Sequence, residues 1–173
     1  SLRQFQVICY LSEDLRRDDK MGSGNSRHAT ALVQSLTPGD ALVYIDLDNF
    51  GEVNEIHGHP GGDRFLREFS DLLSASVRDS DLTARPGGDE FIFIARDAEF
   101  DALPVANRLL QAWRESGEGR SFSAGIAIHD GNDLPETTLY NADQAVLRAK
   151  TQGKNQVCLY PKGGWPGAAA PGY

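Results

Sequence analysis

Cysteine is scarce in this sequence, and its two copies, Cys9 and Cys158, lie far apart. Such a pair has neither the spacing of a zinc site nor the density of a disulfide framework, and it is typical of reduced thiols. Long hydrophobic runs are also missing. The apolar stretches are only as long as a β-strand, so no segment is expected to cross or contact a membrane. These features predict a cytoplasmic location.

Basic residues are in the minority. The 17 Lys and Arg residues face 25 Asp and Glu residues, which gives a net charge of −8. A broad basic face is therefore not expected, and nucleic-acid binding is disfavoured. Any phosphorylated ligand would need local neutralisation by metal ions and a few lysines.

The P-loop and the Gly-x-Gly-x-x-Gly motif are both missing from the sequence, which removes two common classes of nucleotide site.

The stretch 85–91, Arg-Pro-Gly-Gly-Asp-Glu-Phe, is typical of a β-hairpin tip. Gly87 and Gly88 suit a tight two-residue turn, and the apolar run that follows predicts a short strand. Asp89 and Glu90 come directly after the glycines, although a turn that only reverses the chain does not need them. For these residues alone, a solvated turn and a functional site are equally good interpretations.

A second pair of acids, Asp46 and Asp48, ends another apolar run. Their spacing of two places both carboxylates on one side of an extended chain. An EF-hand is excluded, because Phe50 occupies a ligand position and His57 stands where a glutamate is needed. Zinc binding by His57 and His59 lacks a third ligand nearby.

Asp46 and Asp89 converge at one edge of the sheet if their strands pair side by side, because neighbouring strands lie about 5 Å apart. Two carboxylates there suit Mg²⁺, which completes its shell with water and phosphate. Two such ions can activate an attacking hydroxyl and stabilise a leaving group.

These motifs resemble those of the GGDEF family, the diguanylate cyclases. The pentapeptide 87–91 matches the family signature, and Asp-Leu-Asp-Asn-Phe at 46–50 matches its upstream motif. Further matches occur in the right order from about Asp18 to Tyr160: Asn54, Gly58-His59, Gly62-Asp63, Ser123-Ala124-Gly125, Ala142-Asp143, Ala149-Lys150 and Gly153-Lys154-Asn155. The opening segment, residues 18–27, departs from the pattern because Lys20 and Ser23 replace two leucines.

The resemblance implies condensation of two GTP molecules into cyclic di-GMP and two pyrophosphates, with Mg²⁺ or alternatively Mn²⁺ as cofactor. It implies metal binding by Asp46, Leu47 and Asp89, and catalytic roles for Asp46, Asp89 and Glu90. It also implies a substrate-binding set: Asn49, Phe50, Gly51, Asn54, Asp63, Lys150 and Lys154. Because one chain holds one GTP, catalysis needs a homodimer, and an upstream sensor domain is expected.

Each of these roles has a simpler alternative. Asn54 and Asp63 resemble guanine readers, but Asn54 could cap a turn and Asp63 could start a helix. Lys150 and Lys154 resemble contacts to the β- and γ-phosphates, but cations also suit a helix C-terminus. Glu90 has an alternative role as a partner of Arg85 or a lysine. Gly51 replaces a frequent family lysine, which removes one phosphate contact.

Arg78 and Asp81 match the family's inhibitory Arg-x-x-Asp motif, five residues before the Gly-Gly pair. The resemblance implies an allosteric site for cyclic di-GMP, and the alternative is a surface turn.

The hydrophobic pattern predicts one domain of class α+β, with a mixed central sheet and helices on its faces. The resemblance specifies a polymerase-palm or nucleotide-cyclase architecture with a ferredoxin-like βαββαβ core. We expect a connector helix or tail at 1–17, the GGDEF domain at 18–160 and a flexible tail at 161–173. The predicted helices are 4–17, 26–36, 60–77, 101–115 and 136–152, and the predicted strands are 41–46, 81–85, 90–95, 120–129 and 156–160.

Two rival functions stay open at this point. One is a catalytically weak module that binds GTP or cyclic di-GMP to regulate a partner domain, supported by the altered opening segment and Gly51. The other is a different nucleotide cyclase or nucleotidyltransferase on the same architecture.

Overall fold

The computed structural model describes residues 23–98 and 101–167. The predicted helix at 4–17, Cys9 and the first part of the opening segment lie outside the described residues. The elements are α2 (Ser23–Gln34), β1 (Ala41–Leu47), α3 (Phe50–Ser76), β2 (Leu82–Gly87), β3 (Glu90–Ala95), α4 (Ala102–Glu115), β4 (Phe122–Ile128), α5 (Pro135–Thr151) and β5 (Gln156–Leu159). None of these helices combines the length and hydrophobicity needed to cross a membrane.

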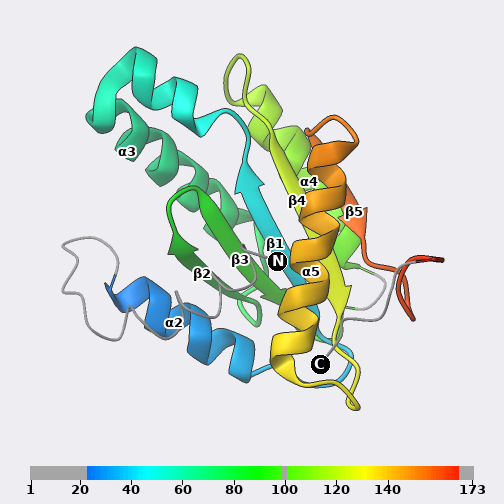
Figure 1. Cartoon of the computed structure of the whole chain (residues 1–173). Helices are drawn as coiled ribbons and strands as arrows, with labels where there is room; N and C mark the ends of the chain where they lie inside the picture. Colours follow the sequence, from blue (N-terminus) through cyan, green and yellow to red (C-terminus); the bar gives the residue numbers. More distant parts are fainter. Residues whose placement is uncertain (1–22, 99–100, 168–173) are drawn as a thin grey trace.

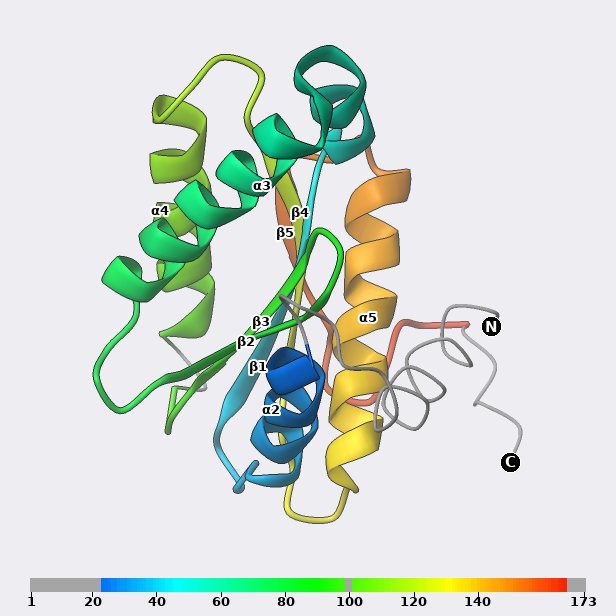
Figure 2. The same cartoon turned by 90° about the vertical axis from the view of Figure 1, so that its left-hand side faces the viewer.

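The strands form one mixed sheet in the order β2-β3-β1-β4-β5. β1 is antiparallel to both β3 and β4, β2 is antiparallel to β3, and β5 is parallel to β4. From β1 to β4 the chain follows the expected ferredoxin-like βαββαβ order. α3 and α4 cover one face of the sheet, and α2 and α5 cover the other (Figures 1 and 2). The predicted fold class is confirmed.

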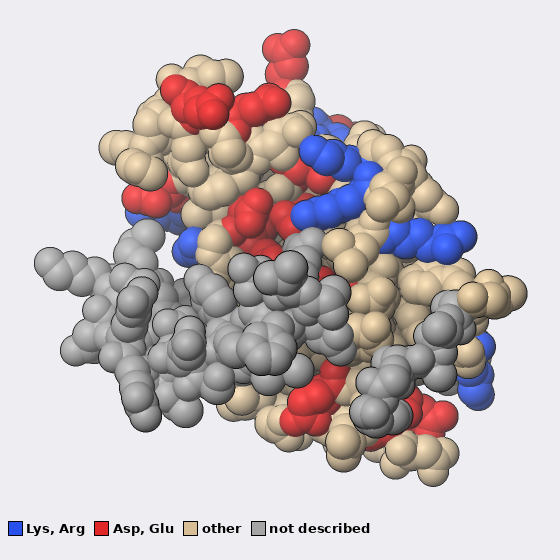
Figure 3. All heavy atoms as spheres, viewed as in Figure 1, with Lys and Arg blue, Asp and Glu red and all other residues tan. Residues whose placement is uncertain are grey.

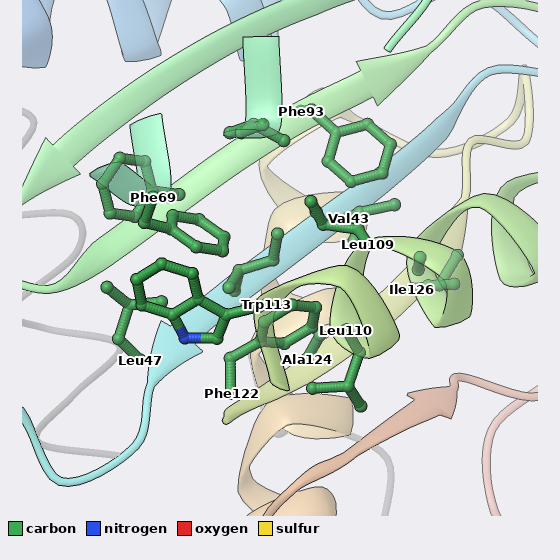
Figure 4. Close-up of a cluster of buried hydrophobic side chains, with 14 of the residues drawn as sticks. Val43, Leu47, Phe69, Phe93, Leu109, Leu110, Trp113, Phe122, Ala124 and Ile126 are labelled. Carbon is green, nitrogen blue, oxygen red and sulfur yellow. The ribbon is translucent and has the colours of Figure 1, made fainter. Parts of the chain in front are cut away.

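The core has two layers because β1, the central strand, is buried on both faces. Alternate residues of a strand point to opposite faces. Val43 and Ile45 therefore pack toward α3 and α4, in the cluster around Trp113 that Figure 4 shows. Leu42 and Tyr44 pack toward α2 and α5. The aromatic rings in the first layer meet edge to face, with the Phe69 and Trp113 centroids 5.1 Å apart, a favourable arrangement.

α3 is longer than predicted and consists of two arms. The backbone leaves the helical conformation at Gly58, with φ 69° and ψ 179°, just before Pro60. The first arm, residues 50–57, was missed because its apolar face is short. Phe50 and Val53 pack against the core, but Ile56 is 73% exposed. The second arm, residues 59–76, matches the prediction and supplies the buried stripe.

The hairpin turn differs by one residue from the prediction. Gly87 pairs with Glu90, so the two turn residues are Gly88 and Asp89 rather than the two glycines. This places Asp89 on the turn itself. The strand β2 also has an irregularity between Ala84 and Gly87.

The first residues after β5 make ordered contacts, although they belong to the segment expected to be a flexible tail. The Trp165 ring meets Tyr160 edge to face at 4.8 Å between centroids, and the Arg148 guanidinium lies 4.9 Å from the Trp165 ring centroid. The part of the predicted tail after residue 167 lies outside the described residues.

α5 lies directly on β4 at Gly125. A Cβ at this position would come within 2.1 Å of the Ala142 carbonyl oxygen and 2.6 Å of the Val146 amide nitrogen. Only a residue without a side chain permits this approach between two backbones. The Ser-x-Gly motif therefore has a packing role at its glycine.

We predict that Gly125→Ala lowers the free energy of unfolding by about 2–3 kcal/mol, because backbone atoms must move to admit the methyl group. Urea denaturation monitored by tryptophan fluorescence measures the change. Gly51→Ala is the matched control, since nothing lies within 4 Å of a Cβ there. It should change stability by less than about 1 kcal/mol. Equal stability of the Gly125 variant and the wild type would contradict this account.

Candidate active site

The end of β1 meets the tip of the β2–β3 hairpin. Asp46 lies opposite Glu90 in the β1–β3 ladder, and the Leu47 amide donates to the Asp89 carbonyl at 3.1 Å. Asp46 follows Tyr44 by two residues, so it points to the face that α5 covers. The structure therefore brings the two acids named from the sequence, Asp46 and Asp89, to one place.

The two carboxylates interact directly. Asp46 is buried, with 5% exposed, and Asp89 is half-buried. The pKa of Asp89 is raised to about 6, first by burial and then by the negative charge of Asp46, with Glu90 acting in the same direction. Two neighbouring carboxylates that are both ionised repel each other, and a bound cation relieves that repulsion.

Lys150 brings a positive charge to these acids. It lies in the last turn of α5, and its Nζ forms an ion pair with Asp46 Oδ2. Figure 3 shows basic side chains over this end of α5 beside acidic ones. The ion pair was not predicted from the sequence.

In the described part of the chain, no group of three or more His, Cys, Asp or Glu residues could hold a metal ion. The acids thus offer only part of a coordination shell.

Glu90 is oriented by the sheet. The Tyr44 hydroxyl donates to Glu90 Oε2 at 2.7 Å, and the Tyr44 side chain is fully buried. Arg85, one of the partners considered for Glu90, donates from Nε to the Gly88 carbonyl at 2.9 Å. Sequence reasoning missed Tyr44, because it looks like one more apolar member of a buried strand.

The turn between β1 and α3 carries the residues expected to contact phosphate. Asn49 has a left-handed φ of 61°, and α3 begins at Phe50. The first amides of a helix have no acceptor within the helix, and the helix dipole favours an anion beside them. Figures 1 and 2 both place the start of α3 and the end of α5 at the same end of the sheet. Asn49, Phe50 and Gly51 therefore lie at the same end as Lys150.

Asn54 and Asp63 lie on different arms of α3. A Cβ at Gly62 would be 1.9 Å from Asn54 Oδ1, so the arms are in close contact at this point. Asp63 is exposed at a cavity of about 280 Å³ that is also lined by His28, Arg67 and other residues. Asn54 does not line this cavity, although it lies against the residue before Asp63.

Arg78 and Asp81 form an ion pair at 3.2 Å at the start of β2. The Arg78 guanidinium also donates to the Arg96 carbonyl at 2.7 Å, and the Arg96 amide donates to Asp81 at 3.0 Å. The strand β2 runs from Leu82 to Gly87, so this pair lies at the opposite end of the hairpin from Asp89. At about 3.3 Å per residue, the two are separated by roughly 20 Å along the strand.

The Arg96 side chain connects this region to a buried acid. It donates to Asp40 Oδ2 at 2.5 Å and to the Ser35 carbonyl at 2.9 Å. Burial acts to raise the pKa of Asp40, but hydrogen bonds from the Asp97 and Thr37 amides and from Arg96 outweigh it and lower that pKa. Asp40 therefore stays ionised and joins the start of β1 to the end of β3.

Asp48, the second acid of the upstream motif, has a different environment from Asp46. It is buried, with 5% exposed, and accepts hydrogen bonds from the Ser121 hydroxyl at 2.7 Å, the Ser123 hydroxyl at 2.8 Å and the Asn155 amide at 3.0 Å. Its carboxylate thus joins the end of β1 to β4 and to the turn before β5. Sequence reasoning missed this role, because the partners are distant in the chain.

The family model for the diguanylate cyclase GGDEF domain matches residues 28–156, which include both acidic motifs and Lys150. The chain belongs to the GGDEF family. The GGDEF signature is thus the hairpin tip at which Asp89 meets Asp46.

The response regulator PleD of Caulobacter vibrioides is 36% identical over 159 residues, covering 81% of this chain and 35% of PleD. The diguanylate cyclase DgcS of Shewanella oneidensis is 32% identical over 143 residues, covering 80% of this chain and 48% of DgcS. This chain therefore spans less than half the length of either relative. A microbial GGDEF domain solved for its interaction with cyclic di-GMP superimposes with a TM-score of 0.66 and 26% identity, covering 78% of this chain and 88% of that one.

We predict that Asp89→Asn stabilises the metal-free protein at about pH 8. The pKa of Asp89 rises on folding from 3.8 to about 6, so its ionised form costs stability above pH 6, and asparagine carries no such charge. The gain, about 1–2 kcal/mol, should shrink as the pH falls below about 6 and should vanish below the unfolded-state pKa of 3.8, where aspartate is protonated in both states. Thermal melts in chelator across this range measure it.

The matched control for this experiment is Asp71→Asn, because Asp71 is exposed on α3. Its melting temperature should follow that of the wild type at every pH. An Asp89→Asn protein that is less stable than the wild type at pH 8 would show that the folded structure does not disfavour the ionised form of Asp89.

Proposed function

We propose that this chain is a diguanylate cyclase domain, which joins two GTP molecules into cyclic di-GMP and releases two pyrophosphates. The observation that carries the proposal is the meeting of Asp46 and Asp89, with Lys150 paired to Asp46, at the GGDEF hairpin tip. DgcS, which shares 32% identity with this chain, is named a diguanylate cyclase. Because GTP is a cytoplasmic nucleotide, the proposal includes a cytoplasmic location.

The donor atoms at the site fit Mg²⁺, or Mn²⁺ in its place. Two repelling carboxylates and the Leu47 backbone carbonyl are hard oxygen donors, and Mg²⁺ binds through one or two carboxylates while substrate phosphates and water complete its shell. When bound as a pair, the ions supply Lewis-acid activation of the 3′-hydroxyl and of the α-phosphate. Asp46 and Asp89 would hold them, and Glu90, oriented by Tyr44, would add negative charge beside them.

Lys150 has a second role in this proposal. Its ammonium neutralises Asp46 in the metal-free protein. With cations at Asp46 and Asp89, the Lys150 ammonium would be free to contact the β- and γ-phosphates, together with Lys154. The amides of Asn49, Phe50 and Gly51 lie at the same end of the sheet and would donate to the same phosphates.

Asp63 and Asn54 would select the base. A carboxylate accepts from the N1 and N2 donors of guanine, and adenine does not present that pair of donors. Asp63 lies at the cavity of about 280 Å³, which supports this role. Asn54 contacts the same part of α3 from the other arm.

The reaction needs two domains that face each other, since one chain carries one set of these residues. The rate per mole of protein should therefore rise with protein concentration until dimers saturate. The chain spans less than half of its curated relatives, which is consistent with regulation by a sensor domain in the same protein.

We predict that the protein converts GTP, in the presence of Mg²⁺, to cyclic di-GMP and pyrophosphate, and that ATP gives no corresponding product. Asp89→Asn should lower turnover at least about 100-fold, because it removes a metal ligand. Chromatography of the products and a pyrophosphate assay measure both effects. The exposed Asp71→Asn is again the control and should keep wild-type turnover. Near-normal activity of Asp89→Asn would rule out the proposed metal site.

A regulatory site at Arg78 and Asp81 belongs to the same proposal. The Arg78 side chain is 52% exposed and can be reached from the surface, whereas the Asp81 side chain is 3% exposed, so a ligand would meet the guanidinium first and the carboxylate only after Arg78 moves. Cyclic di-GMP offers phosphates to the guanidinium and guanine donors to the carboxylate. A solved relative described with cyclic di-GMP supports binding of this ligand by the fold.

We predict that cyclic di-GMP inhibits without competing with GTP, because Arg78 and Asp89 lie at opposite ends of the hairpin. Arg78→Ala should weaken this inhibition about tenfold or more, the effect of a coupling free energy of 1–3 kcal/mol. Initial rates over a matrix of GTP and cyclic di-GMP concentrations measure it. The control is Asp79→Asn, an exposed neighbour that should be inhibited like the wild type. Unchanged inhibition in Arg78→Ala would leave the motif as a surface turn.

A second candidate function is a GTP- or cyclic di-GMP-binding module with little catalysis. The observation that favours it is Gly51, which lies exposed in the first turn of α3 and offers no side chain to a phosphate. Binding of GTP without turnover by the concentrated protein would support this function over the first.

A further inference from the structure

The turn that carries Lys154 has an unusual backbone. Gly153, Lys154 and Asn155 all have positive φ angles, 113°, 62° and 52°. Residues other than glycine rarely adopt this conformation, and two in a row are rarer still. A conformation of this kind persists only when the surrounding contacts impose it. The structure shows which contacts these are.

The first contact comes from β1. The Asn155 amide donates to Asp48 Oδ2 at 3.0 Å. Two serine hydroxyls of residues 121 and 123 donate to the same buried carboxylate, so Asp48 itself is fixed. Asp48 is also the residue directly before Asn49, where the turn into α3 begins. One carboxylate therefore joins the turn of Lys154 to the other segment expected to contact phosphate.

The second contact comes from α4. Arg114 donates from Nε to Asn155 Oδ1 at 2.7 Å and from Nη2 to the Asn155 carbonyl at 3.0 Å. Arg114 thus binds the side chain and the main chain of Asn155 at once, while Asp48 binds its amide. The two charged residues therefore bind the main-chain amide, the main-chain carbonyl and the side-chain oxygen of Asn155. The Lys154 amide, in turn, donates to the Ala149 carbonyl at 3.0 Å at the end of α5.

We propose that Arg114 and Asp48 are positioning residues for the nucleoside triphosphate, and that they act through Lys154. The inference rests on the proposed function, in which Lys154 contacts the β- and γ-phosphates. A lysine on a loose turn loses conformational freedom when it binds, and a turn fixed in advance reduces that cost. Because Asp48 also adjoins Asn49, it sets the separation between Lys154 and the amides of the α3 turn.

A double-mutant cycle on Arg114→Ala and Lys154→Ala tests this inference. The ligands are 3′-deoxy-GTP, which lacks the attacking hydroxyl and so does not react, and GMP, which lacks the β- and γ-phosphates. Calorimetry with Mg²⁺ gives the affinities. Arg114→Ala should weaken 3′-deoxy-GTP binding about tenfold, the effect of a lost charge-assisted hydrogen bond, and leave GMP binding unchanged. The double variant should bind 3′-deoxy-GTP no more weakly than Lys154→Ala alone.

The controls separate positioning from folding. Arg114 is exposed, so Arg114→Ala should keep the wild-type melting temperature within a few degrees. Arg114→Lys, which can donate to Asn155 but not to both of its oxygens in the same geometry, should recover part of the affinity. Arg108→Ala, an exposed arginine on the same helix, should bind like the wild type.

Three outcomes would overturn the inference: unchanged 3′-deoxy-GTP affinity in Arg114→Ala, an equal loss for GMP, or additive losses in the double variant. In each of these cases wild-type binding of 3′-deoxy-GTP, and its weakening by Lys154→Ala, would leave the proposed function intact. A wild-type protein that binds neither nucleotide would instead refute the proposed function, and this inference with it.

Discussion

β1 is buried along its whole length between two layers of helices, and this constraint determines where charge can occur. A buried carboxylate needs partners, so acidic residues appear only at the two ends of the central strand, with Asp40 just before its start. Asp46 and Asp48 lie at its C-terminal end. The hairpin tip brings Asp89 to it, and the last turn of α5 brings Lys150. The candidate site therefore lies at the end of the central strand, where three segments distant in sequence meet.

Local signals in the sequence were sufficient for the element order and for much of the site. Runs of apolar residues with strand or helix spacing predict eight of the described elements with bounds that differ by at most three residues, and the second arm of α3 as well. Asp46 and Asp89 could be paired in advance because strand neighbours are close in space whatever their separation in the chain. The turn position was one residue off, since Gly87 and Gly88 both suit a tight turn and only the β-ladder shows that Gly87 belongs to a strand.

The remaining features depend on long-range side-chain contacts, which leave no periodic pattern. Asp48 receives its hydrogen bonds from residues 73 or more positions away, and Lys150 reaches Asp46 across 104 positions. Tyr44 lies in an apolar run, and its hydroxyl matters only because Glu90 lies in hydrogen-bond range. The first arm of α3 places only Phe50 and Val53 against the core, too few for the periodic pattern that identifies surface helices.

The close approach at Gly125 means that main-chain atoms set the spacing between α5 and the sheet. The same helix carries Lys150, so this contact between two backbones contributes to the distance of Lys150 from Asp46. Core residues of this helix, such as Leu139 and Val146, can then vary in size during evolution with consequences for stability but little displacement of the lysine. A fold with this property can keep a charged site in register while most of its sequence drifts.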